Sequence, residues 1–301
     1  MLAVYLHDLS PFIFQVGSWG PRWYGAAYVL AFLLGYWLYC WLSRKGYTDM
    51  PEALVGDFIT YAAIFGVMIG GRLGWILFYG LKQTHDSPWW FLKVWEGGMA
   101  SHGGIIGLVL FTAWFSKKHK LSWTGIGDSL CVVACVGLFL VRCANFVNGE
   151  LWGKPAGEPG GPPNIPWAVV FPQELEDRMP SLDSIRHDAL TRQALLETLP
   201  PRHPSQIYEA LLEGVFLFTV LWLLRTKVRV PRGVITGAFF ILYAGLRIVG
   251  ETFRVPDPAW SWMGLSAGQT LSLWMFLVGA GFVVWGFRTQ KYEPIFTRES
   301  R

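Results

Sequence analysis

Four polar residues lie close together in the sequence at the end of an apolar stretch of the chain. They are Arg142, Asn145, Asn148 and Glu150. The run GIGDSLCVVACVGLFL precedes them, and their own segment reads VRCANFVNGELWG. An arginine can donate two parallel hydrogen bonds to a phosphate, whereas asparagine amides can also satisfy the free backbone groups of a helix end. The segment is therefore either one wall of an anion-binding site, with Gly153 on the same helical face as Arg142, or a capped helix end.

A second polar group has helical spacing. It consists of Tyr243, Arg247, Glu251 and Arg254 in YAGLRIVGETFR, and on a helix these side chains share one face. Arg247 and Glu251 can pair as i and i+4 neighbours, and such a pair could simply hold a helix bundle together. Two arginines against one glutamate leave a positive excess, however, which favours the binding of an anion.

His102 is the candidate proton acceptor. It lies among glycines in GGMASHGGIIG. Imidazole titrates near neutral pH and is the side chain that most often transfers protons in catalysis. A lone histidine in an apolar segment is more often structural, so this segment alone leaves both interpretations open.

Glycines at four-residue spacing indicate a close contact between helices. Gly66, Gly70 and Gly74 follow the GxxxGxxxG pattern in GVMIGGRLG. Small residues at this spacing let two membrane helices approach closely. Arg72 lies off that face, and it either extends its charge to the membrane surface or is paired inside.

These residues lie in a chain that is too apolar for a typical soluble protein. Of its 301 residues, 52% are hydrophobic and 15% are charged, against about 25% charged residues in soluble domains. A membrane helix needs about 20 mostly apolar residues. Seven stretches qualify, the third being short and rich in glycine: 24–42, 58–79, 99–116, 126–146, 207–224, 233–252 and 266–286. We therefore expect an all-α integral membrane protein with seven transmembrane helices, forming one membrane-embedded domain over 1–301.

The distribution of basic residues predicts how the chain crosses the membrane. The connections 43–56, 117–125, 225–232 and 287–301 carry 13 Lys and Arg in 46 positions, and the alternate connections with the N-terminus carry 9 in 111. Cytoplasmic loops are enriched in Lys and Arg. We therefore expect the N-terminus outside and the C-terminus in the cytoplasm.

The connection 147–203 is the long segment outside the predicted spans. It contains KPAGEPGGPPNIP, whose proline and glycine content excludes a regular helix, and the second half of the charged stretch that follows could form a surface helix. We expect either a small outward-facing head or arm, or a solvated linker.

Several polar residues fall in the outer halves of their predicted spans. They are Tyr24, Arg72, His102, Arg142, Arg247 and Glu251. A common depth predicts a shared, arginine-rich cavity, and the natural anion at that depth is a phospholipid head group. A transporter would instead show polar groups near the midplane and paired repeats, which are not visible. Another phospholipid-modifying enzyme and a non-catalytic scaffold stay open as alternatives.

Taken together, the segments resemble the bacterial prolipoprotein diacylglyceryl transferase family over nearly the whole chain. The family signature G-R-x-[GA]-N-F-hydrophobic-N-x-E-x-x-G matches VRCANFVNGELWG from Arg142 to Gly153, with Val141 in place of the first glycine. Other segments resemble the family in the right order: WYG at 23–25, GGRLGW at 70–75, WEGGMASHGGIIG at 95–107, RHPSQIYEALLEG at 202–214 and YAGLRIVGETFR at 243–254.

The resemblance implies a reaction and a set of site residues. Members of the family transfer the diacylglyceryl group of phosphatidylglycerol to the lipobox cysteine of a prolipoprotein, and glycerol phosphate is released. The thiol must lose its proton, for which His102 is the candidate base, and Arg142 and Arg247 are candidates for stabilising the phosphate-bearing leaving group. The resemblance implies further residues of the head-group pocket: Asn145, Glu150, Gly153, Tyr24, Tyr243 and Glu251, the last orienting Arg247.

The resemblance also implies partners and a location. The expected partners are phosphatidylglycerol, the prolipoprotein signal peptide with its lipobox cysteine, and membrane lipids, but no nucleic acid. The expected location is the bacterial inner membrane, with the 147–203 segment in the periplasm. The sequence contains no HExxH, P-loop or strand-linked GxGxxG motif, so we expect no metal or other cofactor.

Overall fold

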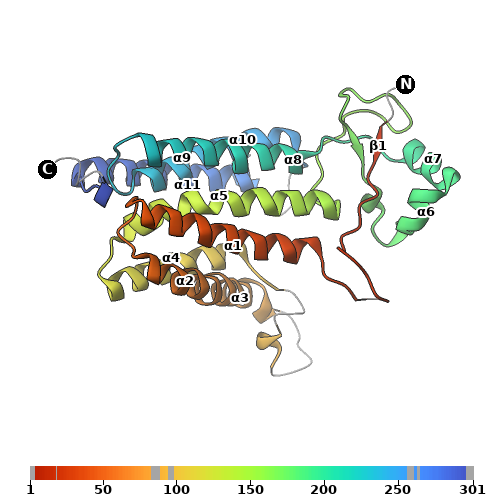
Figure 1. Cartoon of the computed structure of the whole chain (residues 1–301). Helices are drawn as coiled ribbons and strands as arrows, with labels where there is room; N and C mark the ends of the chain where they lie inside the picture. Colours follow the sequence, from red (N-terminus) through yellow and green to blue (C-terminus); the bar gives the residue numbers. More distant parts are fainter. Residues whose placement is uncertain are drawn as a thin grey trace. The chain divides into compact units, whose positions relative to one another are not determined.

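The structure is a computed structural model, and it describes residues 4–17, 19–82, 89–93, 98–255, 261–262 and 265–295. The described residues are mostly helical (Figure 1) and form two compact units. Unit 1 comprises Met1–Gly35, Cys131–Val228 and Val234–Trp285, and unit 2 comprises Tyr36–Leu130, Arg229–Gly233 and Gly286–Arg301. The expectation of one membrane-embedded domain stays a prediction.

Unit 2 contains a helical hairpin. Its first arm is continuous and consists of α2 (Glu52–Tyr61), the π-helical η1 (Ala62–Met68) and α3 (Ile69–Phe78). Its second arm is α4 (Ser101–His119). The connection between the arms includes two short 3-10 turns, η2 (Gly80–Lys82) and η3 (Trp90–Leu92).

The two arms touch along the glycine face that the sequence predicts. A methyl group added at Gly70 would lie 2.6 Å from the carbonyl oxygen of Gly103 and 2.9 Å from Cα of Gly107. A methyl group at Gly74 would lie 2.6 Å from Cα of Gly103. No side chain fits between backbones this close. The predicted close-packing face is confirmed, and its partner is α4.

Ion pairs join the loops of unit 2. Arg232 places Nη1 3.2 Å from Oδ2 of Asp49 and Nη2 3.0 Å from Oε2 of Glu293. The same Asp49 oxygen accepts a hydrogen bond of 2.9 Å from the backbone N–H of Ser122. The loops around 49, 122 and 232 are therefore held together with the segment around Glu293 near the C-terminus.

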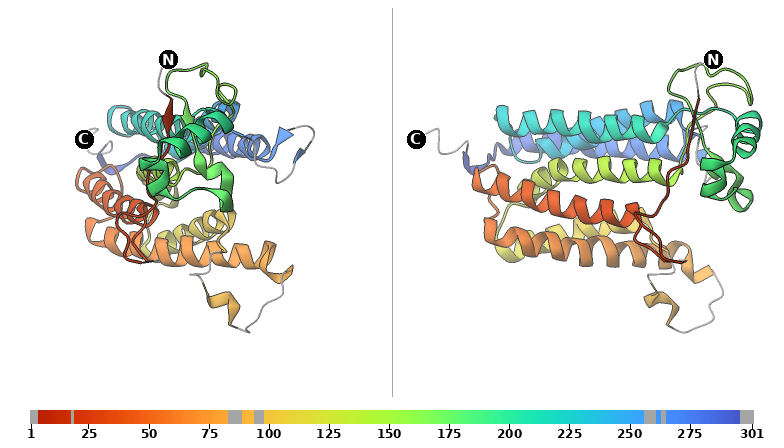
Figure 2. Two further views of the ribbon diagram at one scale, coloured as in Figure 1. Left: turned by 90° about the vertical axis from the view of Figure 1, so that its right-hand side faces the viewer. Right: turned by 45° about the vertical axis from the view of Figure 1, so that its right-hand side comes forward.

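Unit 1 contains the helices that carry most of the candidate site. They are the first part of α1 (Trp23–Arg44), most of α5 (Trp123–Asn148), α8 (Ser205–Glu209), the π-helical η6 (Ala210–Phe216), α9 (Leu217–Lys227), α10 (Val234–Phe253) and α11 (Ala267–Thr289). Figure 2 shows α5, α9, α10 and α11 running alongside one another. Glycines allow this packing, because a methyl group at Gly237 of α10 would lie 2.6 Å from the carbonyl oxygen of Gly279 in α11.

The connection 147–203 folds with the N-terminal segment into a small head at one end of these helices (Figures 1 and 2). Strand β1 (Tyr5–Leu6) pairs in parallel with β2 (Val169–Val170). The head also contains η5 (Pro172–Arg178), α6 (Leu182–His187) and α7 (Ala189–Thr198). Its apolar core consists of Leu6, Val170, Ile185, Leu195 and Leu199. The predicted surface helix is confirmed as the pair α6 and α7. Elsewhere in the unit, β3 (Ser261–Trp262) and β4 (Leu265–Ser266) form an antiparallel pair.

Helical segments of membrane-spanning length dominate the described residues. Six are long and apolar enough to cross a membrane: Trp23–Arg44, Glu52–Phe78, Trp123–Asn148, Ser205–Lys227, Val234–Phe253 and Gly268–Thr289. The predicted third span corresponds to α4, which has 19 residues and is not among these six. The chain is therefore a helical multi-pass membrane protein, and the seventh span stays a prediction.

Candidate active site

Glu209 lies at the centre of a buried ionic cluster in unit 1. Its side chain is fully buried. Its Oε1 lies 2.6 Å from Nη1 of Arg247 and 3.5 Å from Nη1 of Arg254. Its Oε2 lies 2.9 Å from Nη1 of Arg142. One carboxylate from α8 therefore links the last turns of α5 with the end of α10.

Glu213, one turn further along the same helix, supplies a second buried carboxylate. Its Oε2 accepts hydrogen bonds from Nη2 of Arg142 at 3.0 Å and from Nε of Arg142 at 3.3 Å. Its Oε1 lies 3.9 Å from Nη1 of Arg247 and has no hydrogen-bond partner among the described residues. The two acids therefore share both Arg142 and Arg247.

The sequence YEALLEG places both acids on one helical face. Residues four positions apart are neighbours on a helix surface, and α8 continues here into the π-helical η6, a distortion that is frequent at functional sites. Glycines bring the neighbouring helices close. A methyl group at Gly214 would lie 2.6 Å from Cβ of Phe139 in α5, and Gly250 of α10 faces Glu209, where a methyl group would lie 3.5 Å from Cγ.

The acids of the cluster are more deeply buried than the arginines. The side chains of Glu209 and Glu213 have no exposed surface, whereas those of Arg142 and Arg247 keep 14% and 16%. The acids therefore lie behind the arginines, and an anion that reached the cluster would meet the guanidinium groups first. Buried unlike charges compensate one another's loss of hydration. With Arg254, three guanidinium groups and two carboxylates give the cluster one net positive charge when all are ionised.

The polar residues at the end of α5 bind one another. Oε1 of Glu150 accepts a hydrogen bond of 2.6 Å from Nδ2 of Asn145 and one of 3.5 Å from Nδ2 of Asn148. Asn145 is buried. Arg142 and Asn145 lie on the same helix three positions apart, so the carboxylate of Glu150 is held one turn away from the arginine cluster.

Helix α5 ends at Asn148, directly before Gly149. Gly149 has a left-handed backbone with φ of 65°, its N–H donates to the carbonyl of Phe146, and the N–H of Glu150 donates to the carbonyl of Asn145. This pair of reverse bonds is a Schellman motif, which requires glycine or asparagine at the left-handed position. The capped helix end is thus confirmed at Gly149, whereas the binding of an anion by Arg142 stays a prediction.

Gly153 is packed between backbones. A methyl group there would lie 2.5 Å from the carbonyl oxygen of His203 and 2.6 Å from that of Phe253. Its N–H donates to the carbonyl of His203 at 3.0 Å, and it forms a β-bridge with Arg254. Glycine at this position therefore lets the head join the end of α10. Its predicted contact with the lipid stays a prediction.

The two predicted tyrosines also belong to unit 1. Tyr243 of α10 lies within electrostatic range of Arg142, Arg247, Glu209 and Glu213. The ring of Tyr24 in α1 packs 5.3 Å from the ring of Tyr28. Tyr243 therefore lies near the arginine cluster.

Glu251 and Arg247 were expected to pair as neighbours on α10. The structure gives Arg247 a partner from another helix, Glu209. Glu251 lies against Gly268 at the start of α11, where an added methyl group would collide with its carboxylate. An orienting role for Glu251 stays a prediction.

His102 and Arg72 belong to unit 2. The His102 side chain is exposed at the second residue of α4. Arg72 is buried and donates to three backbone carbonyl oxygens: that of Phe91 at 2.9 Å, Trp90 at 2.7 Å and Gly98 at 3.0 Å. Its guanidinium also stacks 4.8 Å from the centre of the Trp75 ring. Arg72 therefore holds the connection between α3 and α4. Of the two alternatives for this arginine, the structure shows the one in which it is paired inside the protein. The shared cavity with unit 1 stays a prediction.

His7 is a buried histidine that sequence patterns did not indicate. In the head, its Nε2 contacts the carbonyl oxygen of Phe146 at 2.7 Å and its Nδ1 contacts Nε2 of Gln173 at 2.8 Å. A neutral ring satisfies both contacts, because Nε2–H donates to the carbonyl and Nδ1 accepts from the amide. Burial lowers the pKa of His7 below its usual value. His7 therefore ties the N-terminal segment to the last turn of α5.

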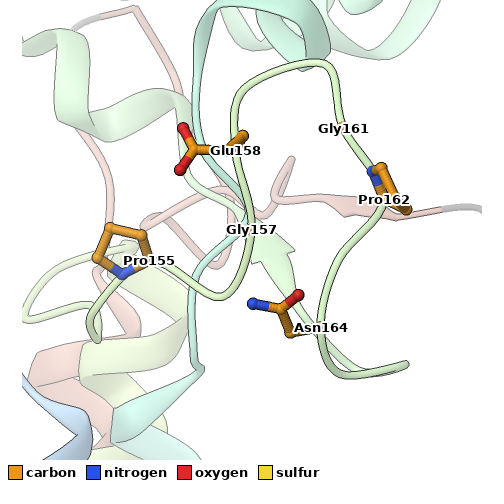
Figure 3. A pocket seen from close by; sticks show the side chains of 6 residues that line it. All are labelled: Pro155, Gly157, Glu158, Gly161, Pro162 and Asn164. Carbon is orange, nitrogen blue, oxygen red and sulfur yellow. The ribbon is translucent and has the colours of Figure 1, made fainter.

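A cavity of about 270 Å³ lies in the loop that follows Gly153 (Figure 3). Its lining residues are Pro155, Gly157, Glu158, Gly161, Pro162 and Asn164. Figure 3 shows the loop curling around the side chain of Asn164. The lining includes one acid and no basic residue, so this cavity is unsuited to a phosphate. Among the described residues, no group of three or more His, Cys, Asp or Glu could hold a metal ion.

The family model for prolipoprotein diacylglyceryl transferase matches residues 11–285. Three similar proteins are each named phosphatidylglycerol–prolipoprotein diacylglyceryl transferase. The protein of Rhodospirillum centenum is 40% identical over 92% of this chain and 91% of its own length. That of Proteus mirabilis is 37% identical over 95% of both chains, and that of Bdellovibrio bacteriovorus is 37% identical over 93% and 94%.

Proposed function

The chain belongs to the prolipoprotein diacylglyceryl transferase family, and from that premise we propose how its ionic cluster performs the reaction. The enzyme transfers the diacylglyceryl group of phosphatidylglycerol to a prolipoprotein, which is the first step of lipoprotein lipidation. We propose that the acceptor is the thiol of the lipobox cysteine and that the phosphate of the lipid binds Arg142 and Arg247.

The observation that carries this proposal is the order of burial in the cluster. Glu209 and Glu213 are fully buried behind Arg142 and Arg247, which keep some exposed surface. The acids fix the two guanidinium groups from behind, and nitrogen atoms on the exposed side can then donate to phosphate oxygens. Donors fixed in advance need no reorganisation when charge develops on the leaving group.

The proposed step is a single displacement. The cysteine sulfur attacks the terminal carbon of the diacylated glycerol, which carries the phosphate ester. A C–S bond forms, and the bond between that carbon and the phosphate-ester oxygen breaks. The bonding electrons leave with the oxygen, so that glycerol phosphate departs with an additional negative charge, which Arg142 and Arg247 stabilise. The thiol proton passes to a base before or during attack, because the thiolate is the nucleophile.

We propose His102 as that base, because imidazole is the side chain that most often transfers protons in catalysis and this one is exposed at the start of α4. A His102→Gln variant tests this role. Retention of the wild-type rate and pH profile by the folded variant would remove His102 from the mechanism.

The residues around the arginines form the proposed head-group pocket. Asn145 and Glu150, which bind each other, face the glycerol end of the lipid, and Tyr243 lines the pocket beside the cluster. Tyr24, Gly153 and Glu251 complete the proposed set. Single alanine variants of Asn145 and Tyr243 should raise the KM for phosphatidylglycerol, and unchanged values would exclude them from the pocket.

We propose that α4 crosses the membrane as a seventh span. It packs along the span Glu52–Phe78 through Gly103 and Gly107 and ends in Lys117, Lys118 and His119, as expected for a helix that reaches a basic membrane surface. Seven spans put the two termini on opposite sides of the inner membrane, and the basic loops favour a periplasmic N-terminus and head with a cytoplasmic C-terminus. Labelling of the variants Gln193→Cys and Lys291→Cys in membrane vesicles tests this topology. A thiol reagent applied from the periplasmic side should react at position 193 and not at position 291.

The transfer assay tests the reaction itself. The purified chain is incubated with phosphatidylglycerol and a peptide that contains a lipobox cysteine, and the peptide mass is measured. A thioether-linked diacylglyceryl group is expected on the peptide and is not expected on its Cys→Ser counterpart. Absence of lipidated peptide under conditions in which a related enzyme is active would overturn the proposed function.

A further inference from the structure

Side chains from the segment 202–206 bind the backbone of the segment that carries Glu150. Nε2 of Gln206 donates to the carbonyl of Glu150 at 2.6 Å, and Oγ of Ser205 donates to the carbonyl of Leu151 at 2.9 Å. Nη1 of Arg202 donates to the carbonyl of Gly153 at 3.1 Å. We term Arg202, Ser205 and Gln206 the carbonyl clamp.

The clamped segment has an unusual backbone. Gly149 and Leu151 both have left-handed φ angles, 65° and 59°. Leucine rarely adopts this conformation, because its Cβ crowds the carbonyl oxygen, so surrounding contacts must maintain it. Ser205 and Gln206 are fully buried, so the carbonyls of this turn accept hydrogen bonds from donors that are shielded from water. The clamp therefore maintains the turn that carries Glu150.

Gln206 and Glu209 lie one turn apart on α8. Gln206 holds the backbone of Glu150, and Glu209 holds Arg142 and Arg247. One short helix thus fixes the distance between the Glu150–Asn145 pair and the arginine pair. A head group that contacts both pairs would require this distance to be constant.

We propose that Gln206 and Ser205 are positioning residues for the phosphatidylglycerol site, an inference that rests on the proposed function. They contact no reacting atom and act through the backbone of Glu150 and Leu151. Their loss moves Glu150 and Asn145 away from the positions that bind the glycerol head group, while Arg142 and Arg247 keep their carboxylate partners.

The test compares Gln206→Met with the wild-type enzyme, because methionine keeps the side-chain volume and removes the donor. The KM for phosphatidylglycerol should rise by about tenfold or more, since the carbonyl of Glu150 loses the hydrogen bond that holds its turn. The kcat at saturating lipid and the KM for the lipobox peptide should stay within about threefold of wild type. A change of this size corresponds to less than the free energy of one such hydrogen bond. Ser205→Ala should change the same KM in the same direction by a smaller factor.

Two controls make the outcome specific. Gln193 is an exposed glutamine of α7 that donates to Glu197, and Gln193→Met should leave all three parameters unchanged. In an enzyme that already carries Glu150→Gln, Gln206→Met should produce little further rise in the KM for phosphatidylglycerol, because the clamp acts through Glu150.

The results separate this inference from the proposed function. Absence of transfer by the wild-type chain would overturn both. Transfer by the wild type together with an unchanged KM for phosphatidylglycerol in Gln206→Met would overturn the clamp alone, as would equal losses with both substrates. If Gln206→Met does not fold, Ser205→Ala decides, and an unchanged KM in that variant also overturns the inference.

Discussion

Oε1 of Glu209 lies 2.6 Å from Nη1 of Arg247, and the two residues come from different helices 38 positions apart in the chain. The same carboxylate lies 2.9 Å from Arg142. Glu209 therefore links the arginines of α5 and α10, together with Glu213, in one cluster.

Glu209→Gln should remove most of the activity. The substitution keeps the shape of the side chain but removes the carboxylate that pairs with Arg142, Arg247 and Arg254. Glu213 then carries the remaining negative charge against Arg142 and Arg247. Breaking a buried ion pair costs about 3–5 kcal/mol, so a lower Tm and a loss of about 100-fold in kcat/KM are expected. Glu197→Gln, at an exposed site on α7, is the matched control. Wild-type kcat/KM in folded Glu209→Gln would contradict the role of this carboxylate in holding the arginines for catalysis.

Arg142→Lys should be nearly as harmful as Arg142→Ala. The guanidinium places different nitrogens on Glu209 and Glu213, and a single ammonium cannot reproduce this fork. Loss of a positioned donor to a developing anion costs about 10²–10³-fold in rate, and a fall in kcat of this size is expected. Arg178→Lys, at an exposed site of the head, should have no effect. A conservative change that preserved kcat would show that charge alone is sufficient.

Arg142 and Glu209 show which parts of the site sequence patterns could predict and which they could not. The polar segment at the end of α5 and the glycine face of α3 were predictable, because helix periodicity and capping are local. Glu209 and Glu213 were missed, although YEALLEG shows two acids four positions apart in an apolar stretch. Their partners lie 38 and 71 positions away. The choice between Glu251 and Glu209 as the partner of Arg247 depends on how helices pack, which a single helix pattern does not contain.

The head should lose stability as the pH falls. Burial lowers the pKa of His7, so the folded chain binds a proton less readily than the unfolded chain. The unfolded state therefore takes up more protons below about pH 6.5, and stability falls with decreasing pH in that range. Above that pH the contribution of neutral His7 is fully present. Thermal unfolding between pH 8 and 5 should show this dependence.

His7→Gln isolates the contribution of this histidine. Glutamine does not titrate in this range, so the variant should have a lower Tm at pH 8 and a weaker dependence of Tm on pH. An identical pH dependence in the variant and the wild type would assign the effect to other groups.

Gly153→Ala should destabilise the junction between the head and α10. The added methyl group would lie within 2.6 Å of two backbone carbonyl oxygens, so the backbone must move. Overpacking of this kind costs about 1–3 kcal/mol. Gly281→Ala in α11 is the control, because no atom lies within 4 Å of its added methyl group. Equal Tm values for both variants and the wild type would contradict the tight packing of Gly153.

The stoichiometry of the two products tests the central claim most directly. Phosphorus NMR measures the glycerol phosphate released from phosphatidylglycerol while mass spectrometry measures the lipidated peptide in the same reaction. Displacement at the glycerol carbon predicts one glycerol phosphate for each thioether formed, with both products lost in Arg142→Ala. Thioether formation without glycerol phosphate, or full production of both in folded Arg142→Ala, would contradict the role of the arginine cluster.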